Sequence, residues 1–329
     1  MPPPRKPPPP RSWLRASPRL SAVLVVCLTC GAALAALRLR GASPALPLHA
    51  CSAPDGLHVI YCGADLMAVT AEAVPAPPGR VPPYGEVRVM NAHGATAAAE
   101  RSHFILQSWV NVAQRSSSLT YIEVGAELFL RVLYGGDGHT ANIEAQPAPR
   151  VLLLGLGAGA LPTALRRLCG ARPALRGCAG LRLPAVDASA DALRIARSFV
   201  IRDDGHVLRF VHDTAEHFVA RSARPAALAR LAPGIWDARW DLIVNDAYAG
   251  ARGVARDAAF VADVARALRP GTGVYCVNAL STGADEGARG RAEDAMAAVF
   301  GAGAVRVEAE DGSNAWLCAT APHEPRKIN

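Results

Sequence analysis

The sequence predicts an α/β fold in which helices cover both faces of a parallel sheet. The first observation is a buried apolar strand at 150–154 that leads through a glycine-rich turn into a helix. The second is that strand-like and helix-like segments alternate from that turn to about residue 300. The third is that an aspartate directly follows three of the strands. Because βα repetition places parallel strands beside crossover helices, these observations predict a Rossmann-like sheet.

The individual elements follow in order along the chain. Strands are expected at 150–154, 181–186, 207–212, 240–245 and 273–278, and helices at 161–169, 189–199, 214–220, 257–268 and 286–300. Strands at 304–308 and 315–320 flank an Asp311-Gly-Ser-Asn314 turn and predict a terminal hairpin. Further upstream, strands at 58–62, 66–70, 86–90 and 103–110 and a helix at 121–134 predict a small β-rich unit.

Composition divides the chain into segments. We expect a Pro/Arg-rich segment at 1–19, an apolar run at 20–37, a linker at 38–56, the β-rich unit with its helix at 57–140, and the Rossmann-like domain at 141–329. About 275 residues after the first fifty suffice for one large α/β domain with an appendage. The net charge of +7 arises from seven basic residues before position 41, so no nucleic-acid surface is expected on the remainder.

The uncharged run at 20–37 predicts a single transmembrane helix or signal anchor. Its eighteen residues are close to the minimum that spans a bilayer. Five basic residues precede the run and only Arg38 and Arg40 follow it closely, which favours placement of the domain after the run on the lumenal side. A cleaved signal peptide of a secreted protein and an organellar transit sequence are the alternatives.

The glycine turn is suited to a nucleotide-like ligand. Gly155, Gly157 and Gly159 permit positive φ and lack the Cβ atoms that would keep a ligand from the backbone. The helix that follows offers free N–H groups at its N-terminus. Because glycine-rich strand ends also serve packing alone, the turn indicates a ligand only together with the residues after it.

The three aspartates lie at the strand ends where open α/β sheets bind ligands. Asp187 is expected to bind a ribose, or alternatively to cap the helix near 189. Asp213 is expected to contact a base, or alternatively to cap the helix at 214. Asp246 ends a buried strand beside the cleft, where an unpartnered carboxylate would be costly, and this favours a functional or hydrogen-bonded role.

Four motifs occur in a fixed order along this part of the chain. They are Gly155-Leu-Gly-Ala-Gly-Ala-Leu-Pro162, Val186-Asp-Ala-Ser189, Val211-His-Asp213 and Trp240-Asp-Leu-Ile-Val-Asn-Asp246-Ala-Tyr248. Together they resemble the spermidine synthase-like branch of the class I S-adenosylmethionine-dependent methyltransferases. Upstream, Gln107-Ser108 and Thr120-Tyr121-Ile-Glu123 resemble the strand and helix before the nucleotide domain of that branch, so the likeness covers 85–329.

The resemblance implies a seven-stranded sheet and S-adenosylmethionine as the cofactor. It implies Asp187 on the ribose hydroxyls, Asp213 near the adenine and Asp246 facing the acceptor. It also implies that the β-rich unit covers the cleft, contributes Gln107 and Tyr121 to the substrate site, and takes part in homodimer contacts.

The chain departs from true aminopropyltransferases at three positions. Where those enzymes carry an Asp in the glycine loop, a Gln after the tyrosine and a second Asp after the strand-end Asp, this chain has Ala158, Ile122 and Ala249. In those enzymes the three groups bind and deprotonate a diamine, which is cationic in water and needs carboxylates around it. We therefore expect a methyltransferase of unknown acceptor, in which Asp246 and Tyr248 orient or deprotonate an amine. The alternatives are an aminopropyltransferase that uses decarboxylated S-adenosylmethionine in polyamine biosynthesis, and a non-catalytic homologue that acts as a binding module.

Eight cysteines bear on the compartment. Cys51 with Cys62 and Cys169 with Cys178 are expected as two short-range disulfides if the domain is lumenal, and as free thiols in a reducing compartment. Cys276 and Cys318 lie in mid-strand positions, where buried free thiols are ordinary. No spacing of cysteines or histidines predicts a metal site.

Overall fold

The computed structural model describes residues 51, 53, 56–71, 85–91, 106–112, 114–117, 119–135, 148–173, 175, 177–181, 183–201, 208–224, 239–249, 252–253, 257–280, 287–311 and 314–323. The chain divides into two units, Met1–Pro44 and Ala45–Asn329, and every described residue belongs to the second. The segments predicted at 1–19 and 20–37 and most of the linker at 38–56 lie outside the described residues. Among the helices that are described, none has the length and apolar character needed to cross a membrane.

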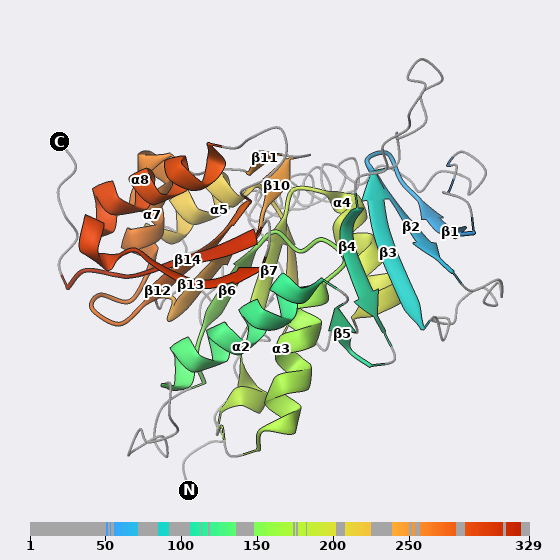
Figure 1. The fold of residues 1–329 in the computed structure, drawn as a ribbon, viewed down its shortest axis with the longest axis horizontal. Helices are drawn as coiled ribbons and strands as arrows, with labels where there is room; N and C mark the ends of the chain where they lie inside the picture. Colours follow the sequence, from blue (N-terminus) through green and yellow to red (C-terminus); the bar gives the residue numbers. More distant parts are fainter. Residues whose placement is uncertain are drawn as a thin grey trace, which may run out of the picture. The chain divides into compact units, whose positions relative to one another are not determined.

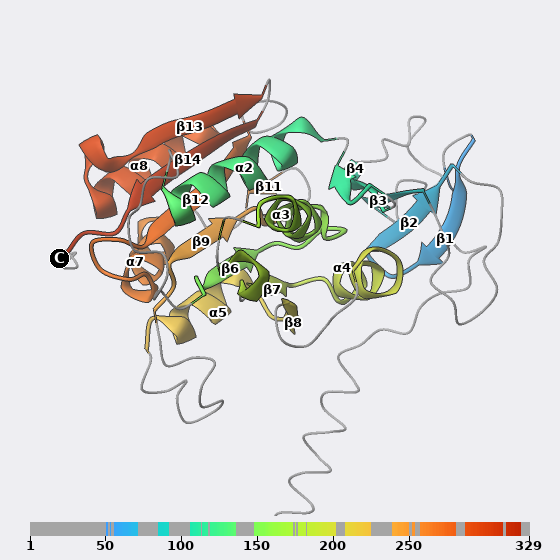
Figure 2. The same ribbon diagram turned by 90° about the horizontal axis from the view of Figure 1, so that it is seen from below.

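A mixed seven-stranded sheet carries the fold (Figure 1), and its strands follow the order β13-β14-β12-β9-β6-β7-β8, all of them labelled in Figure 2. Its strands are β6 (Val151–Leu154), β7 (Leu183–Asp187), β8 (Leu208–His212), β9 (Leu242–Asn245), β12 (Val274–Leu280), β13 (Arg306–Asp311) and β14 (Asn314–Thr320). The strands β8, β7, β6, β9 and β12, which are adjacent in this order, run parallel to one another. By contrast, β14 is antiparallel to both β12 and β13. The predicted parallel sheet with a terminal hairpin is confirmed.

The strand order creates one topological switch point. From β6 the chain moves to β7 and β8 on one side, then returns to β9 on the other side of β6. Crossover connections on the two sides therefore leave opposite faces of the sheet, which opens a crevice at the carboxyl ends of β6 and β9. This is the edge at which the sequence places Gly155 and Asp246.

Helices cover both faces of the sheet (Figures 1 and 2). The helices of one face are α2 (Thr120–Tyr134), α3 (Ala160–Ala171) and α4 (Ala190–Ile195), and those of the other are α5 (Ala215–Ser222), α7 (Ala258–Ala267) and α8 (Ala288–Phe300). Along β6, Val151 and Leu153 belong to the first core and Leu152 and Leu154 to the second. A strand with alternate side chains buried on opposite faces is expected to be continuously apolar, as this one is.

Shorter elements complete the described part of this domain. They are η3 (Cys178–Gly180), the π-helical turn η4 (Ala196–Val200), β10 (Tyr248–Ala249), β11 (Arg252–Gly253) and η5 (Ala302–Ala304). The single helix expected at 189–199 is thus α4 continued by a π-helical turn.

A second, antiparallel sheet of five strands precedes α2 (Figure 1). Its strands, in spatial as well as chain order, are β1 (His58–Cys62), β2 (Leu66–Thr70), β3 (Glu86–Asn91), β4 (Leu106–Asn111) and β5 (Ser116–Ser117). Tyr61, Val89 and Val110 of this sheet belong to the same buried core as α2 and α3. The small sheet is therefore packed continuously onto the α/β domain.

A close contact between Gly125 and Trp316 seats α2 on the large sheet. Trp316 of β14 is 1% exposed, and its indole Nε1 donates a hydrogen bond to the carbonyl oxygen of Tyr121 at 3.0 Å. A Cβ at Gly125 would lie 2.7 Å from that nitrogen. Only glycine allows this approach, and the contact fixes the first turn of α2, where Tyr121 lies.

Three disulfides join all six cysteines that the structure describes. The two expected pairs, Cys51–Cys62 and Cys169–Cys178, are bonded. The prediction of free thiols in β12 and β14 was wrong, because Cys276 and Cys318 also form a disulfide. The antiparallel register places these two residues directly opposite each other, with Cα atoms 4.2 Å apart. Pairing of strands 42 residues apart is a tertiary property that neither strand reveals by itself.

Candidate functional site

The glycine turn brings two strand ends together by backbone contact. Gly155, Gly157 and Gly159 all have positive φ, of 86°, 53° and 82°. A Cβ at Gly155 would lie 2.5 Å from the carbonyl oxygen of Asp246. Residue 155 must therefore be glycine, because its φ is positive and because the backbone after β9 lies too close for a Cβ atom. The turn continues into α3, whose N-terminus has no side-chain cap.

Asp187, the last residue of β7, braces this turn. Its Oδ2 accepts hydrogen bonds from the backbone N–H groups of Leu156 at 2.8 Å and Gly157 at 3.3 Å, and its Oδ1 accepts one from Ser189 N–H at 2.8 Å. Burial raises the pKa of Asp187, and these three N–H groups partly oppose that shift. The backbone N–H groups of Leu156 and Gly157 in the turn thus bind Asp187, whereas the N–H groups predicted to be free belong to the first turn of α3, which begins at Ala160.

The capping alternative for Asp187 is not what the structure shows. The N-cap of α4 is Ser189, whose hydroxyl accepts a hydrogen bond from Ala192 N–H at 3.2 Å. Because a carboxylate oxygen has two lone pairs, Oδ1 of Asp187 retains an acceptor position beyond the one that Ser189 occupies.

Asp246 follows β9 on the opposite side of the turn. Asn278 of β12, fully buried, donates from Nδ2 to Oδ1 of Asp246 at 2.8 Å. The preceding residue, Asn245, is also fully buried; it donates to the Tyr275 hydroxyl at 3.1 Å and accepts from Ala247 N–H at 3.1 Å. Two buried amides therefore fix the chain on both sides of this carboxylate.

Asp213 occupies a different environment from the other two aspartates. Its Oδ1 is 2.9 Å from Nδ1 of His217 and accepts from Thr214 N–H at 3.0 Å, and its Oδ2 pairs with Arg221. The N-cap of α5 is Thr214, which accepts from His217 N–H at 3.2 Å. Asp213 thus holds the start of α5 and does not line the cavity described next.

One cavity of about 630 Å³ lies at the switch point, between the glycine turn, the strand ends and the small sheet. Its lining includes Asp65, Leu66, Ser108, Tyr121, Ile122, Gly155, Leu156, Gly157, Ala160, Asp187, Ser189, Thr214, Glu216, Asp246 and Ala247. Four of the lining residues carry carboxylates and none of those described is basic. The cavity has the size of a small-molecule site and favours a cationic ligand.

The structure gathers most of the residues that the sequence singled out. Gly155, Gly157, Asp187, Asp246 and Tyr121 all line the cavity. Gly159 lies against Ile201 instead, where a Cβ would be 2.4 Å from the isoleucine Cδ1. Gln107 lies in β4 and Tyr248 in β10, and the side chains of both are outside what the structure describes.

Sequence reasoning missed Asp65, Ser108 and Glu216 as lining residues, and Asn278 as the partner of Asp246. The only sequence signal for Asn278 was an amide inside the otherwise apolar strand Val-Tyr-Cys-Val-Asn-Ala-Leu. A fully buried amide requires a partner, so it indicates a polar neighbour without naming it.

Comparisons with known proteins find similar folds at low identity. No protein-family model and no curated protein matches the chain. A probable spermidine synthase from Corynebacterium glutamicum is 20% identical with a TM-score of 0.49, covering 82% of this chain and 81% of that one. Human methyltransferase-like protein 13, in complex with SAH, is 18% identical with a TM-score of 0.40, covering 66% and 83%. A SAM-dependent methyltransferase from Agrobacterium tumefaciens is 16% identical with a TM-score of 0.38, covering 82% and 91%.

Proposed function

We propose that this chain is an S-adenosylmethionine-dependent methyltransferase whose cofactor occupies the cavity at the switch point. The observation that carries the proposal is the arrangement of Gly155, Gly157 and Asp187 around one acid-lined cavity. Because glycines in the turn carry no side chain, a nucleoside can lie close to the backbone. The remaining acceptor position on Oδ1 of Asp187 accepts a hydrogen bond from a ribose hydroxyl. The carboxylates suit the positive charge of a sulfonium cofactor.

The remaining predicted residues take roles according to their place. We assign the adenine to the side of Thr214 and Glu216, with Asp213 holding that turn through His217 and Arg221. Gly159 allows the turn to pack on Ile201 and so sets the direction of α3. We assign Tyr121 of α2 and Gln107 of β4 to the acceptor side.

Methyl transfer asks little acid–base chemistry of the protein. The bound cofactor supplies an electrophilic methyl group: the acceptor nitrogen forms the new N–C bond as the S–C bond breaks, and the sulfur keeps the bonding electron pair. Asp246, oriented by Asn278, aligns an amine acceptor and receives the proton that the nitrogen loses. Tyr248 follows two residues later and is the second candidate for orienting the acceptor.

Aminopropyl transfer is the second candidate function. It is favoured by the four carboxylates of the lining, because both decarboxylated S-adenosylmethionine and a diamine acceptor are polycations. Against it, Ala158 is fully buried and Ile122 is 3% exposed, where aminopropyltransferases of the resembling branch carry polar groups that contact substrate.

Ligand binding and product analysis test these proposals on the full-length chain. Calorimetry should detect S-adenosylmethionine, and Asp187→Ala should weaken it about tenfold or more, since hydrogen bonds to a charged group contribute about 1.5–3 kcal/mol. Asp263→Ala, which removes a half-buried carboxylate of α7 that pairs with Arg266, is the control for removal of a carboxylate away from the cavity. No binding to the parent chain, or equal binding to Asp187→Ala, would contradict the cofactor assignment.

Two parallel reactions separate the candidate activities. Methyl-labelled S-adenosylmethionine with a cell extract should yield a labelled product that Asp246→Ala abolishes. Putrescine with decarboxylated S-adenosylmethionine should yield no spermidine. Robust polyamine formation would replace the methyltransferase assignment with the aminopropyltransferase.

We further propose that residues 20–37 anchor the chain in a membrane with the α/β domain on the lumenal side. Support comes from the apolar length of that run, the basic residues before it and the three disulfides, which persist in oxidising compartments. Carbonate extraction should leave the chain with the membranes, and a C-terminal tag should resist protease in sealed vesicles. Release by carbonate would reject the anchor, and digestion of the tag would reject the orientation.

A further inference from the structure

The turn between β1 and β2 forms a wall of the ligand cavity. Asp65 and Leu66, at the end of this turn, line the cavity together with Asp187 and Ser189 of the large domain. From the sequence, the turn between β1 and β2 was predicted only to connect two strands. Because the turn lies against residues more than a hundred positions later in the chain, a tertiary contact must hold it there.

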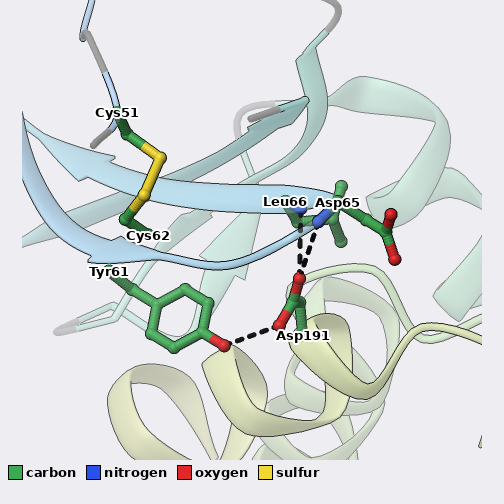
Figure 3. Close-up of a disulfide and its surroundings, with 6 residues drawn as sticks. All are labelled: Cys51, Tyr61, Cys62, Asp65, Leu66 and Asp191. Atoms are coloured by element: carbon green, nitrogen blue, oxygen red, sulfur yellow. Dashed lines mark hydrogen bonds between the residues drawn. A yellow bond between two sulfur atoms is a disulfide. The ribbon is translucent and has the colours of Figure 1, made fainter. Parts of the chain in front are cut away.

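Asp191 of α4 holds the turn in place (Figure 3). Its side chain accepts hydrogen bonds from the Tyr61 hydroxyl at 2.6 Å and from the backbone N–H groups of Asp65 at 2.9 Å and Leu66 at 3.3 Å. The residue is only 3% exposed, and Arg194 donates to the same Tyr61 hydroxyl at 3.0 Å. A buried carboxylate with three donors from one hairpin is a strong fixed contact.

Close packing makes this contact specific. A Cβ at Gly63 would lie 2.3 Å from the carboxyl carbon of Asp191, so the turn can approach only because residue 63 is glycine. Gly63 N–H donates to the carbonyl oxygen of Leu66 at 2.9 Å, which closes the turn. The Cys51–Cys62 disulfide anchors the strand just before it (Figure 3). The hairpin thus reaches the cavity as a rigid element.

The carboxylate of Asp65 is the polar group that this arrangement presents to the ligand. It is exposed, and it forms no hydrogen bond or ion pair with any residue that the structure describes, while its own backbone is fixed by Asp191. The other acidic side chains in the described lining are those of Asp187, Glu216 and Asp246. Because no described residue of the lining is basic, a positive group of the ligand is the countercharge that this carboxylate can meet inside the cavity.

We propose that Asp65 binds the positively charged end of the ligand and that Asp191 is the residue that positions it. The inference rests on the proposed function for the identity of the ligand, whose positively charged groups are the sulfonium and the ammonium of S-adenosylmethionine. Asp65 thereby makes the small sheet part of the binding site and gives it selectivity for charge.

Binding of a charged and a neutral ligand to the full-length chain tests the proposal. S-Adenosylmethionine carries the positive groups, whereas 5′-methylthioadenosine keeps the adenosine and the sulfur without them. Asp65→Asn should weaken S-adenosylmethionine about three- to fivefold, as expected for a solvent-exposed charge pair, and leave 5′-methylthioadenosine unchanged. Asp191→Asn should produce the same selective loss, and the double variant should lose no more than Asp191→Asn alone. Asp263→Asn is the control for removal of a carboxylate and should change neither affinity.

The outcomes separate this inference from the proposed function. Equal weakening of both ligands by Asp65→Asn, or no change in either, would overturn the charge-binding role while the parent chain still binds S-adenosylmethionine. Additive losses in the double variant would show that Asp191 does not act through Asp65. If Asp191→Asn fails to fold, Tyr61→Phe removes one donor of the same contact and takes its place. A parent chain that binds no S-adenosylmethionine would overturn the proposed function, and this inference with it.

Discussion

At the scale of single residues, the candidate site is a set of carboxylates whose partners differ. Asp187 is bound by backbone N–H groups, Asp246 by a buried amide and Asp213 by an arginine and a histidine. Strand-end position alone predicted that all three would be at the cleft. The structure shows that Asp187 and Asp246 line the cavity, whereas Asp213 holds the start of α5. Their hydrogen-bond and ion-pair partners distinguish these two environments.

The raised pKa of Asp187 leads to a prediction about pH. Burial favours the protonated form, so the carboxyl titrates above its usual value of 3.8 in the folded chain. Protonation removes the negative charge that strengthens the hydrogen bond from a ribose hydroxyl, and affinity for S-adenosylmethionine should therefore fall as the pH is lowered from 7, with a midpoint above 3.8. Calorimetry across this range measures the midpoint.

Asp187→Asn isolates the contribution of this residue, because other carboxylates line the same cavity. The variant should bind S-adenosylmethionine more weakly at pH 7, and its affinity should lack the change with pH that the titration of Asp187 causes in the parent chain.

The effect of Asp187 on stability has the opposite sign from that of an ordinary paired carboxylate, whose folded-state pKa is lowered. Since the folded-state pKa is raised, the free energy of unfolding decreases as the pH rises from 3.8 through the folded-state pKa. If affinity and the free energy of unfolding depend on pH identically in the parent chain and in Asp187→Asn, the assignment of Asp187 as the titrating ribose acceptor is contradicted.

At the scale of elements, most of the fold could be predicted because its determinants are local. A continuously apolar run marks a strand buried on both faces, and glycine after it marks a turn with positive φ. Register and contacts between distant elements have no such local signal. The Cys276–Cys318 disulfide and the Asn278–Asp246 hydrogen bond both arise from strand pairing, and neither was predicted.

The seating of α2 on the sheet yields a stability prediction. Gly125→Ala adds a Cβ within 2.7 Å of the buried Trp316 indole. Alanine favours a helix by about 1 kcal/mol over glycine, whereas overpacking of a core costs about 1–3 kcal/mol, and displacement of Trp316 also weakens its hydrogen bond to Tyr121. We expect a net loss of about 1–3 kcal/mol and a melting temperature lower by about 2–4 °C per kcal/mol.

Gly170→Ala is the matched control for this substitution. Gly170 lies in α3, and a Cβ there would meet nothing within 4 Å. The same change should therefore be neutral or raise the melting temperature, because only the helix propensity acts. Equal shifts for the two variants would show that the Trp316 contact does not hold α2.

At the scale of the whole molecule, the ligand site depends on two sheets that lie far apart in the chain. The carboxyl ends of β6, β7 and β9 could be predicted to meet, because parallel strands share that edge. That the small sheet covers the cleft was expected only from the family resemblance, and the part played by the β1–β2 hairpin was not predicted, because it depends on a core common to both sheets and on the contact of Asp191 with that hairpin. A site of this kind requires the complete fold.

The disulfides, taken together, predict the compartment in which this fold is formed. Structural disulfides persist in oxidising compartments and are rare in the cytosol. All six described cysteines are paired, and Cys27 and Cys30, in the apolar run at 20–37, lie outside the described residues. We expect the full-length chain, denatured directly from cells without reductant, to resist thiol labelling at the six paired positions.

Mass-tagged maleimide added before and after reduction measures this expectation. After free thiols are blocked, reduction should release six cysteines for tagging, and the double variant Cys276→Ser with Cys318→Ser should release four. Eight cysteines labelled before reduction would place the chain in a reducing compartment and contradict the lumenal orientation. Six protected cysteines would instead mean that a cavity suited to a sulfonium cofactor lies on the oxidising side of the membrane, where the cofactor must be delivered to it.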